Sequence, residues 1–133
     1  MVYALDTNIL SELLKANARI VAGYEAVPET DEVVITTISR FEILRGRYAA
    51  ILKAADRVEL LLAQSRFDAD ESKLTRFRLL TVTDAVADRF EMLRTNKKLK
   101  KIGREDLLIA CVALANAATL VTRNTRISPT CPA

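Results

Sequence analysis

The 133-residue sequence contains no histidine. This absence excludes Ser-His triads, histidine general bases and the usual histidine-ligated zinc hydrolases. Any hydrolytic chemistry in this chain must therefore depend on carboxylates, and a hard divalent cation is the natural partner of such groups.

Other residue types are scarce. The two cysteines, Cys111 and Cys131, form neither a disulfide framework nor a paired metal-ligand motif, and we expect both to be reduced. Aromatic residues make up 5% of the chain and tryptophan is absent, which argues against a platform for stacking single strands. We therefore expect a nucleic-acid substrate to be bound through its backbone charge and its shape.

Long apolar runs are also missing. The longest, 107–121, is interrupted by Asn116 and is shorter than the roughly 18–20 residues of a membrane span. Asp6 interrupts the apolar segment that a secretory signal would need. We therefore expect a cytoplasmic protein without a membrane partner.

What is present indicates a single α/β domain. Half of the residues are hydrophobic, enough for a substantial core, and the net charge of +3 permits a nucleic-acid partner without demanding one. β-prone runs alternate with helical patterns, which predicts a short parallel sheet covered by helices. The four expected strands are 2–5, 33–36, 79–82 and 118–122.

Between the second and third strands, the apolar spacing predicts one long helix over 48–65 and another opened by the acidic residues 68–71 and carrying Leu74 and Phe77. Paired helices of this kind commonly form a lid or a partner surface beside an α/β core. Shorter helices are expected over 9–14, around 20–24 and from Asp84.

Acidic residues follow the ends of the first two strands. Asp6 directly follows the first strand, at the edge of a parallel sheet where ligands bind, although it could equally be an N-cap. Glu42 stands in the expected first turn of a helix, and Ser39 and Glu42 together fit a capping box. Each carboxylate therefore has a structural and a functional interpretation.

Glu105 and Asp106 open a helix that is apolar on every face from Leu107 onward, so this helix is expected to be buried all round. Adjacent helical residues point about 100° apart, and we expect only one of the two acids to enter a site. A basic run precedes this helix and is either a solvated helix end or a phosphate-contacting surface. Its members are Arg94, Lys97, Lys98, Lys100, Lys101 and Arg104.

Asn124 follows the fourth expected strand, so Asp6, Glu42, Asp106 and Asn124 all adjoin the edge where strands end. Crowded carboxylates repel one another unless a cation neutralises them. Ligands that are all oxygen favour Mg²⁺ or Mn²⁺ over zinc or copper. The pattern predicts an acidic pocket for such an ion.

Four ordered segments resemble the PIN-domain family, and most closely its VapC-type toxins from toxin–antitoxin pairs. They are Leu5-Asp6-Thr7-Asn8, Ser39-x-x-Glu42-Ile43-Leu44-x-Gly46, Gly103-x-x-Asp106-Leu107-Leu108-Ile109-Ala110 and Thr119-Leu120-Val121-Thr122-Arg123-Asn124. Each is weak alone, but the ordered set is specific.

The resemblance implies a three-layer α/β/α fold and a metal-dependent endoribonuclease that hydrolyses RNA. It also implies a homodimer held inactive by a VapB-like antitoxin. By carry-over, the metal ligands are Asp6, Glu42 and Asp106, and the catalytic set adds Asn124. Thr7, Asn8 and Ser39 would support the cofactor site.

The C-terminus departs from the family pattern, which has a further acid and an aromatic residue followed by a fifth strand. Ile127 and Ser128 stand at those two places, and Pro129 and Pro132 disfavour a central strand. We therefore expect a nuclease domain over 1–126 and an atypical tail over 127–133, with the fifth strand truncated.

Two other functions stay open at this point. A catalytically silent PIN-like module that binds antitoxin or RNA would explain the altered tail. A phosphotransferase with Asp6 as covalent acceptor suits the sheet edge, but the related dehalogenase-like enzymes need an aspartate where this chain has Asn8.

Overall fold

The computed structural model describes residues 1–123. Its centre is a parallel sheet in the order β3-β2-β1-β4. The strands are β1 (Val2–Leu5), β2 (Glu32–Thr36), β3 (Arg78–Leu80) and β4 (Thr119–Val121). The four predicted strands are therefore confirmed, with ends that differ by at most two residues.

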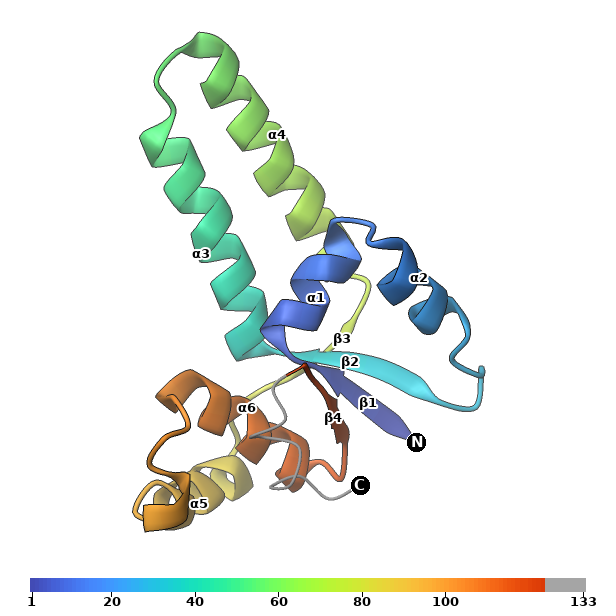
Figure 1. Cartoon of the computed structure of the whole chain (residues 1–133), viewed down its shortest axis with the longest axis vertical. Helices are drawn as coiled ribbons and strands as arrows, with labels where there is room; N and C mark the ends of the chain where they lie inside the picture. Colours follow the sequence, from blue (N-terminus) through green and yellow to red (C-terminus); the bar gives the residue numbers. More distant parts are fainter. Residues whose placement is uncertain (124–133) are drawn as a thin grey trace.

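Helices cover both faces of this sheet, which gives the predicted three-layer α/β/α arrangement (Figure 1). The helices are α1 (Thr7–Leu14), α2 (Ala18–Glu25), α3 (Thr37–Lys53), α4 (Arg57–Leu74), α5 (Asp84–Leu93) and α6 (Arg104–Ala115), with a 3₁₀ turn η1 (Lys97–Leu99). No helix within residues 1–123 is long and apolar enough to cross a membrane.

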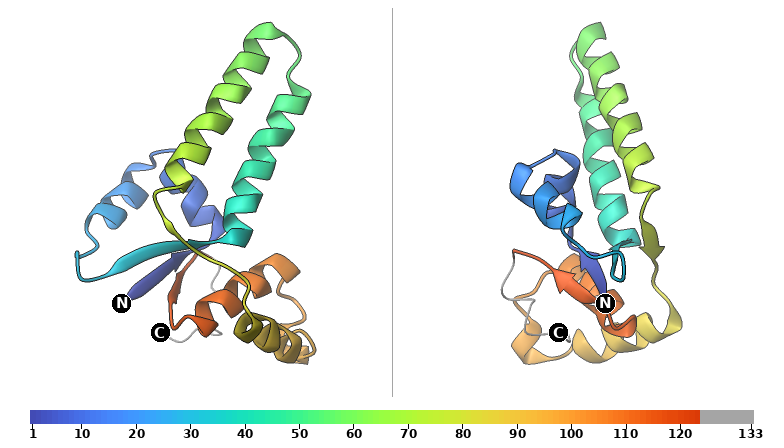
Figure 2. Two further views of the ribbon diagram at one scale, coloured as in Figure 1. Left: turned by 180° about the vertical axis from the view of Figure 1, so that it is seen from behind. Right: turned by 90° about the vertical axis from the view of Figure 1, so that its right-hand side faces the viewer.

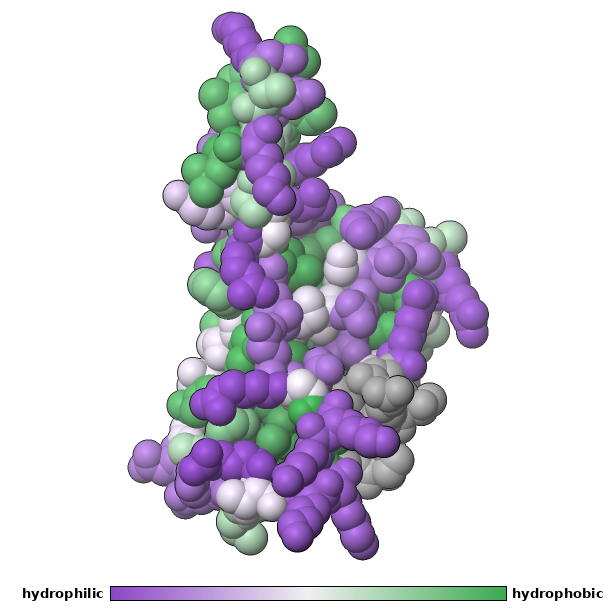
Figure 3. Space-filling model, turned by 60° about the vertical axis from the view of Figure 1, so that its left-hand side comes forward, coloured by the Kyte–Doolittle hydropathy of each residue, from purple (hydrophilic) through white to green (hydrophobic). Residues whose placement is uncertain are grey.

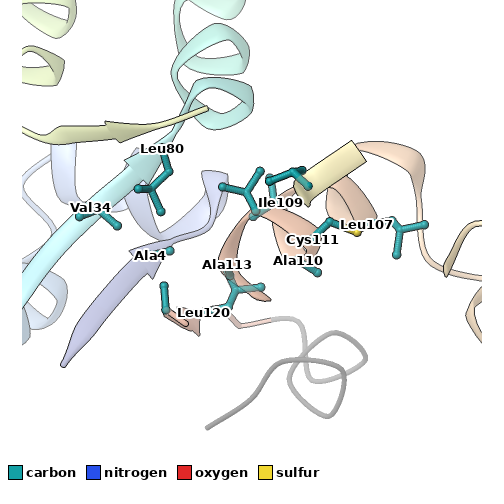
Figure 4. Close-up of a cluster of buried hydrophobic side chains, with 12 residues drawn as sticks. Ala4, Val34, Leu80, Leu107, Ile109, Ala110, Cys111, Ala113 and Leu120 are labelled. Atoms are coloured by element: carbon teal, nitrogen blue, oxygen red, sulfur yellow. The ribbon is translucent and has the colours of Figure 1, made fainter. Parts of the chain in front are cut away.

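Strand alternation divides the core in two. Ala4, Val34 and Leu80 face α6 and α5, where α6 contributes a nearly continuous run of buried residues (Figure 4). Leu5 and Ile35, one position along each strand, face the opposite layer of α1 and α4. The prediction that the helix from Leu107 onward is buried all round is confirmed for most positions, whereas Leu108, Leu114 and Ala115 are half-buried.

Helices α3 and α4 form a hairpin that projects away from the sheet (Figures 1 and 2). The predicted helix boundaries here are wrong, because α3 ends at Lys53 and α4 runs unbroken through residues 68–71. A capping box explains the break: Asp56 accepts from the Glu59 N–H at 2.8 Å, and Glu59 accepts from the Ala55 N–H at 2.9 Å.

Asp70, predicted to lie at a helix start, is instead buried in α4 and is 4% exposed. Its Oδ2 lies 2.5 Å from Nε of Arg47 on α3. This ion pair joins the two arms of the hairpin. A buried carboxylate is tolerated in a helix only when it is paired in this way.

Candidate acidic site at the sheet edge

The parallel register places the ends of β1, β2 and β4 side by side. Leu5 is opposite both Ile35 and Val121, so the next residues, Asp6, Thr36 and Thr122, are neighbours at one edge. The Asp6 N–H extends the ladder by donating to the Val121 carbonyl at 3.0 Å. Polar side chains from three strands therefore converge where the sheet ends.

Asp6 is 6% exposed and is held from two sides. Its Oδ1 accepts from the Ile9 N–H at 2.9 Å, which makes it the N-cap of α1, and its Oδ2 accepts from the Thr122 hydroxyl. The capping interpretation is thus confirmed. It does not compete with a functional role, since the two hydrogen bonds fix the carboxylate at the edge.

Glu42 lies in the second turn of α3, and not in the first as predicted. Thr36 is the N-cap and accepts from the Ser39 N–H at 3.1 Å, so the proposed capping box of Ser39 and Glu42 is wrong. Glu42 instead reaches across to α1, where its Oε1 accepts from the Thr7 hydroxyl at 2.6 Å. The side chain is therefore directed into the site.

Ser39 and Thr7 form a short hydroxyl network behind Glu42. Ser39 is fully buried, and its Oγ lies 3.0 Å from Thr7 Oγ1 and 3.4 Å from Thr36 Oγ1. Asn8 is exposed and lines a cleft of about 320 Å³ together with Thr7, Glu42 and Arg45. Thr7 thus hydrogen-bonds to the Glu42 carboxylate, whereas Ser39 contacts the Thr7 hydroxyl.

Glu105 and Asp106 begin α6 and both approach the other acids. Burial raises the pKa of the Asp106 carboxyl, and the nearby charges of Asp6 and Glu105 raise it further. Burial likewise raises the pKa of Glu42 to about 7, reinforced by its hydrogen bond with Glu105 and opposed by Thr7 and Arg45. The four carboxylates therefore repel one another.

The prediction that only one of the two α6 acids approaches the site is therefore too restrictive. Glu105 is exposed, yet it interacts with Glu42, and its Oε1 lies 3.8 Å from a guanidinium nitrogen of Arg45. Within residues 1–123, no three acidic, histidine or cysteine side chains are arranged to hold one metal ion. The acids form a chain of neighbours, in which Asp106 interacts with both Asp6 and Glu105, and Glu105 interacts with Glu42.

Sequence reasoning missed Thr122 and Glu105 as members of this site. Thr122 could have been found from the register, because a parallel β1–β4 pair places it beside Asp6. Asn124 and the 126/127 boundary lie outside the residues that the structure describes.

A family model for the PIN domain matches residues 3–131. The chain belongs to the PIN-domain family. Ribonuclease VapC1 of Haemophilus influenzae strain R2866 is 29% identical to this PIN-domain chain over 133 residues, covering 95% of this chain and 89% of the relative.

Solved structures resemble the whole PIN-domain chain. The VapBC2 complex of Rickettsia felis bound to a promoter DNA fragment matches with a TM-score of 0.75 and 26% identity, covering 99% of this chain and 94% of that one. FitAcB of Neisseria gonorrhoeae matches with a TM-score of 0.74 and 26% identity, covering 98% and 92%.

Proposed function

We propose that this PIN-domain chain is a VapC-type toxin, an endoribonuclease that hydrolyses RNA phosphodiester bonds at the acidic edge of its sheet. The observation that carries the proposal is the chain of neighbouring carboxyls at one edge of the sheet, Asp6, Asp106, Glu105 and Glu42, with raised pKa values for Glu42 and Asp106. The VapC1 ribonuclease matches nearly the whole chain. Crowded carboxylates repel one another unless a cation neutralises them.

Ribonucleases of this family generally depend on divalent metal ions. The chemistry of the donor set suits such an ion, because its atoms are all oxygens and the carboxylates repel one another without a cation; the side chains would have to draw together to share one ion. We assign the ion as Mg²⁺ or Mn²⁺, with Asp6, Asp106 and Glu42 as its ligands. When bound, it would activate water and neutralise phosphate charge.

The surrounding residues orient these ligands. Thr122 and the Ile9 N–H fix both oxygens of Asp6, so this carboxylate keeps one orientation without an ion. The Thr7 hydroxyl directs Glu42 toward the site. Asn8, on the cleft wall, and Asn124 are assigned supporting roles by the family pattern, and Ser39 holds Thr7 in place.

RNA backbone contacts are assigned to the exposed lysines before α6. Within the basic run, Arg94 is already bonded to Glu91, and Arg104 lies 4.7 Å from the centre of the Phe90 ring. The lysines at 97, 98, 100 and 101 are exposed, and the run leads directly to Asp106. Such lysines contribute sequence-independent affinity that falls with salt.

The projecting hairpin is the surface we assign to a VapB-like antitoxin. It exposes apolar side chains among hydrophilic ones (Figure 3), including Tyr48, Leu52, Val58, Leu61 and Leu62. The solved structures that match this chain include VapBC and FitAB toxin–antitoxin complexes. We also assign a homodimer, which light scattering of the isolated chain would show as twice the 14.8 kDa chain mass.

The test is cleavage of single-stranded RNA by the purified chain. Cleavage should require Mg²⁺ or Mn²⁺, stop in excess EDTA, and fall at least 100-fold in Asp106→Asn. The matched control is Asp88→Asn, which changes an exposed aspartate on α5. Equal cleavage by the Asp106→Asn variant would refute the assignment.

A catalytically silent module is the second candidate. It is favoured by the lack of a three-ligand arrangement within residues 1–123 and by Ile127 where the family has an acid. Expression without the antitoxin separates the two candidates. Growth arrest that requires Asp106 supports the enzyme, whereas harmless expression with retained antitoxin binding supports the module.

A further inference from the structure

A second, largely apolar hollow of about 300 Å³ opens beside the acidic site. It is separate from the cleft that Asn8 lines, although Glu42 borders both. Its lining residues are Thr37, Ile38, Phe41, Glu42, Val82 and Glu105. The lining of the hollow is therefore largely apolar and includes two of the site carboxylates.

Phe41 leaves an aromatic ring in water at this place. The residue is 63% exposed although it directly precedes Glu42 on α3. Val82, across the hollow, is 46% exposed. Phe41 and Val82 together form an accessible apolar surface beside Glu42, which we assign to the metal site.

Arg45 adds a positive charge to the same ring. Its guanidinium carbon lies 5.7 Å from the centre of the Phe41 ring, one helical turn along α3. Its contact with Glu105 is a long 3.8 Å, and its side chain is 58% exposed. The guanidinium is therefore accessible to an anion that approaches the ring.

We propose that this hollow is a nucleotide subsite that binds one unpaired base of the RNA next to the cleaved bond. The base stacks on Phe41, and Arg45 binds a phosphate of the same nucleotide. The inference rests on the proposed function, because the acidic site beside the hollow is where the phosphodiester would lie.

The combination of features matches a nucleotide better than a purely apolar partner. A nucleotide presents a flat π-face joined to an anion; the hollow presents the Phe41 ring, and the Arg45 guanidinium lies beside that ring from the neighbouring cleft. Every base has such a face, so the subsite needs no particular sequence. One exposed ring suffices for one base, even in a chain with few aromatics.

The first experiment measures stacking without catalysis. Single-stranded RNA carrying 2-aminopurine at one position is titrated with the full chain in EDTA, and the fluorescent base is moved along the strand. Stacking on Phe41 should quench the base at one position. Phe41→Ala should abolish the quenching and Phe41→Tyr should keep it.

The matched control is Tyr48→Ala, which removes an exposed aromatic from α3 that does not line the hollow. It should leave the quenching unchanged. Equal loss of quenching in Phe41→Ala and Tyr48→Ala would overturn the subsite, because it would show a general effect of the α3 surface.

The second experiment measures cleavage. Phe41→Ala should lower kcat/KM by about 5- to 150-fold, the range that base–aromatic stacking contributes. An abasic nucleotide at the quenched position should cause a similar loss in the wild type and no further loss in Phe41→Ala. Arg45→Gln should weaken binding and reduce its salt dependence, with partial rescue by Arg45→Lys.

The outcomes separate this inference from the proposed function. If quenching requires Phe41 but the wild type does not cleave RNA, base stacking in the hollow stands as RNA binding and the nuclease assignment fails. If the wild type cleaves in an Asp106-dependent way and Phe41→Ala cleaves equally well, the subsite is refuted. A change of molar mass or of antitoxin binding in Phe41→Ala, with RNA binding intact, would show a protein interface instead.

Discussion

Replacing Glu42 by glutamine should stabilise the metal-free protein at pH 8 while removing its response to divalent cations. Glutamine keeps an oxygen that can accept from the Thr7 hydroxyl, but it removes the charge that faces Glu105. The wild-type carboxyl has a pKa of about 7 in the folded chain, against 4.5 for the unconstrained group. Ionisation of Glu42 therefore opposes folding.

The sign follows from linkage. Below pH 4.5 Glu42 is protonated in both the folded and the unfolded protein, and its contribution to stability is fully present. The folded protein binds this proton more tightly, so the contribution is lost as the pH rises through 7. The whole difference in pKa corresponds to about 3 kcal/mol. Because solvent reaches the half-buried side chain, screening reduces the effect to about 1–2 kcal/mol.

The assay is urea unfolding followed by circular dichroism in EDTA, at pH values between 4.5 and 8. The stability difference between Glu42→Gln and wild type should grow across this interval to about 1–2 kcal/mol in favour of the variant. Glu71→Gln, an exposed change on α4, is the control and should track the wild type. The reasoning is refuted if the unfolding free energies of Glu42→Gln and wild type differ by the same amount at every pH.

Three further predictions concern the hairpin, the helix ends and the metal. Asp70→Asn should lower the free energy of unfolding by about 3 kcal/mol, because it removes the negative charge that pairs with Arg47 and is only 4% exposed. Glu71→Gln, measured in the same denaturation experiment, should cost little. Ala117→Gly should raise the free energy of unfolding by about 1 kcal/mol, because Ala117 has φ 51° at the Schellman end of α6, a conformation that glycine adopts without strain. A lower melting temperature of the variant would contradict this. Mn²⁺ at about 100 times its Kd should stabilise the wild type by about 2.7 kcal/mol in thermal unfolding but not Asp106→Asn, and equal shifts in both would place the ion elsewhere.

The sheet and its acidic edge were predictable because their signals are local. The short apolar strands β1 and β2 end abruptly at Asp6 and Thr36, and parallel pairing then brings their ends together. The buried α6 was equally clear, because it is apolar on every face. These features follow from hydrophobic pattern alone.

The hairpin and the exact partners of the acids were harder to predict. Apolar spacing ran across the break at Ala54–Asp56, and only the capping box of Asp56 and Glu59 marked it. The partner of Asp70 is 23 positions away on another helix, so no local signal could identify its burial. Glu42 fitted a local cap, but its hydrogen bond to Thr7 depends on how α3 packs against α1.

The central claim is that the carboxylates at the sheet edge bind one divalent cation that serves RNA hydrolysis. A crystal soaked in Mn²⁺ tests it most directly, because anomalous scattering locates the ion without reference to activity. The account predicts a peak within about 2.0–2.3 Å of oxygens from both Asp6 and Asp106, lost in Asp106→Asn. A peak elsewhere on the molecule, or none at saturating Mn²⁺, would contradict it.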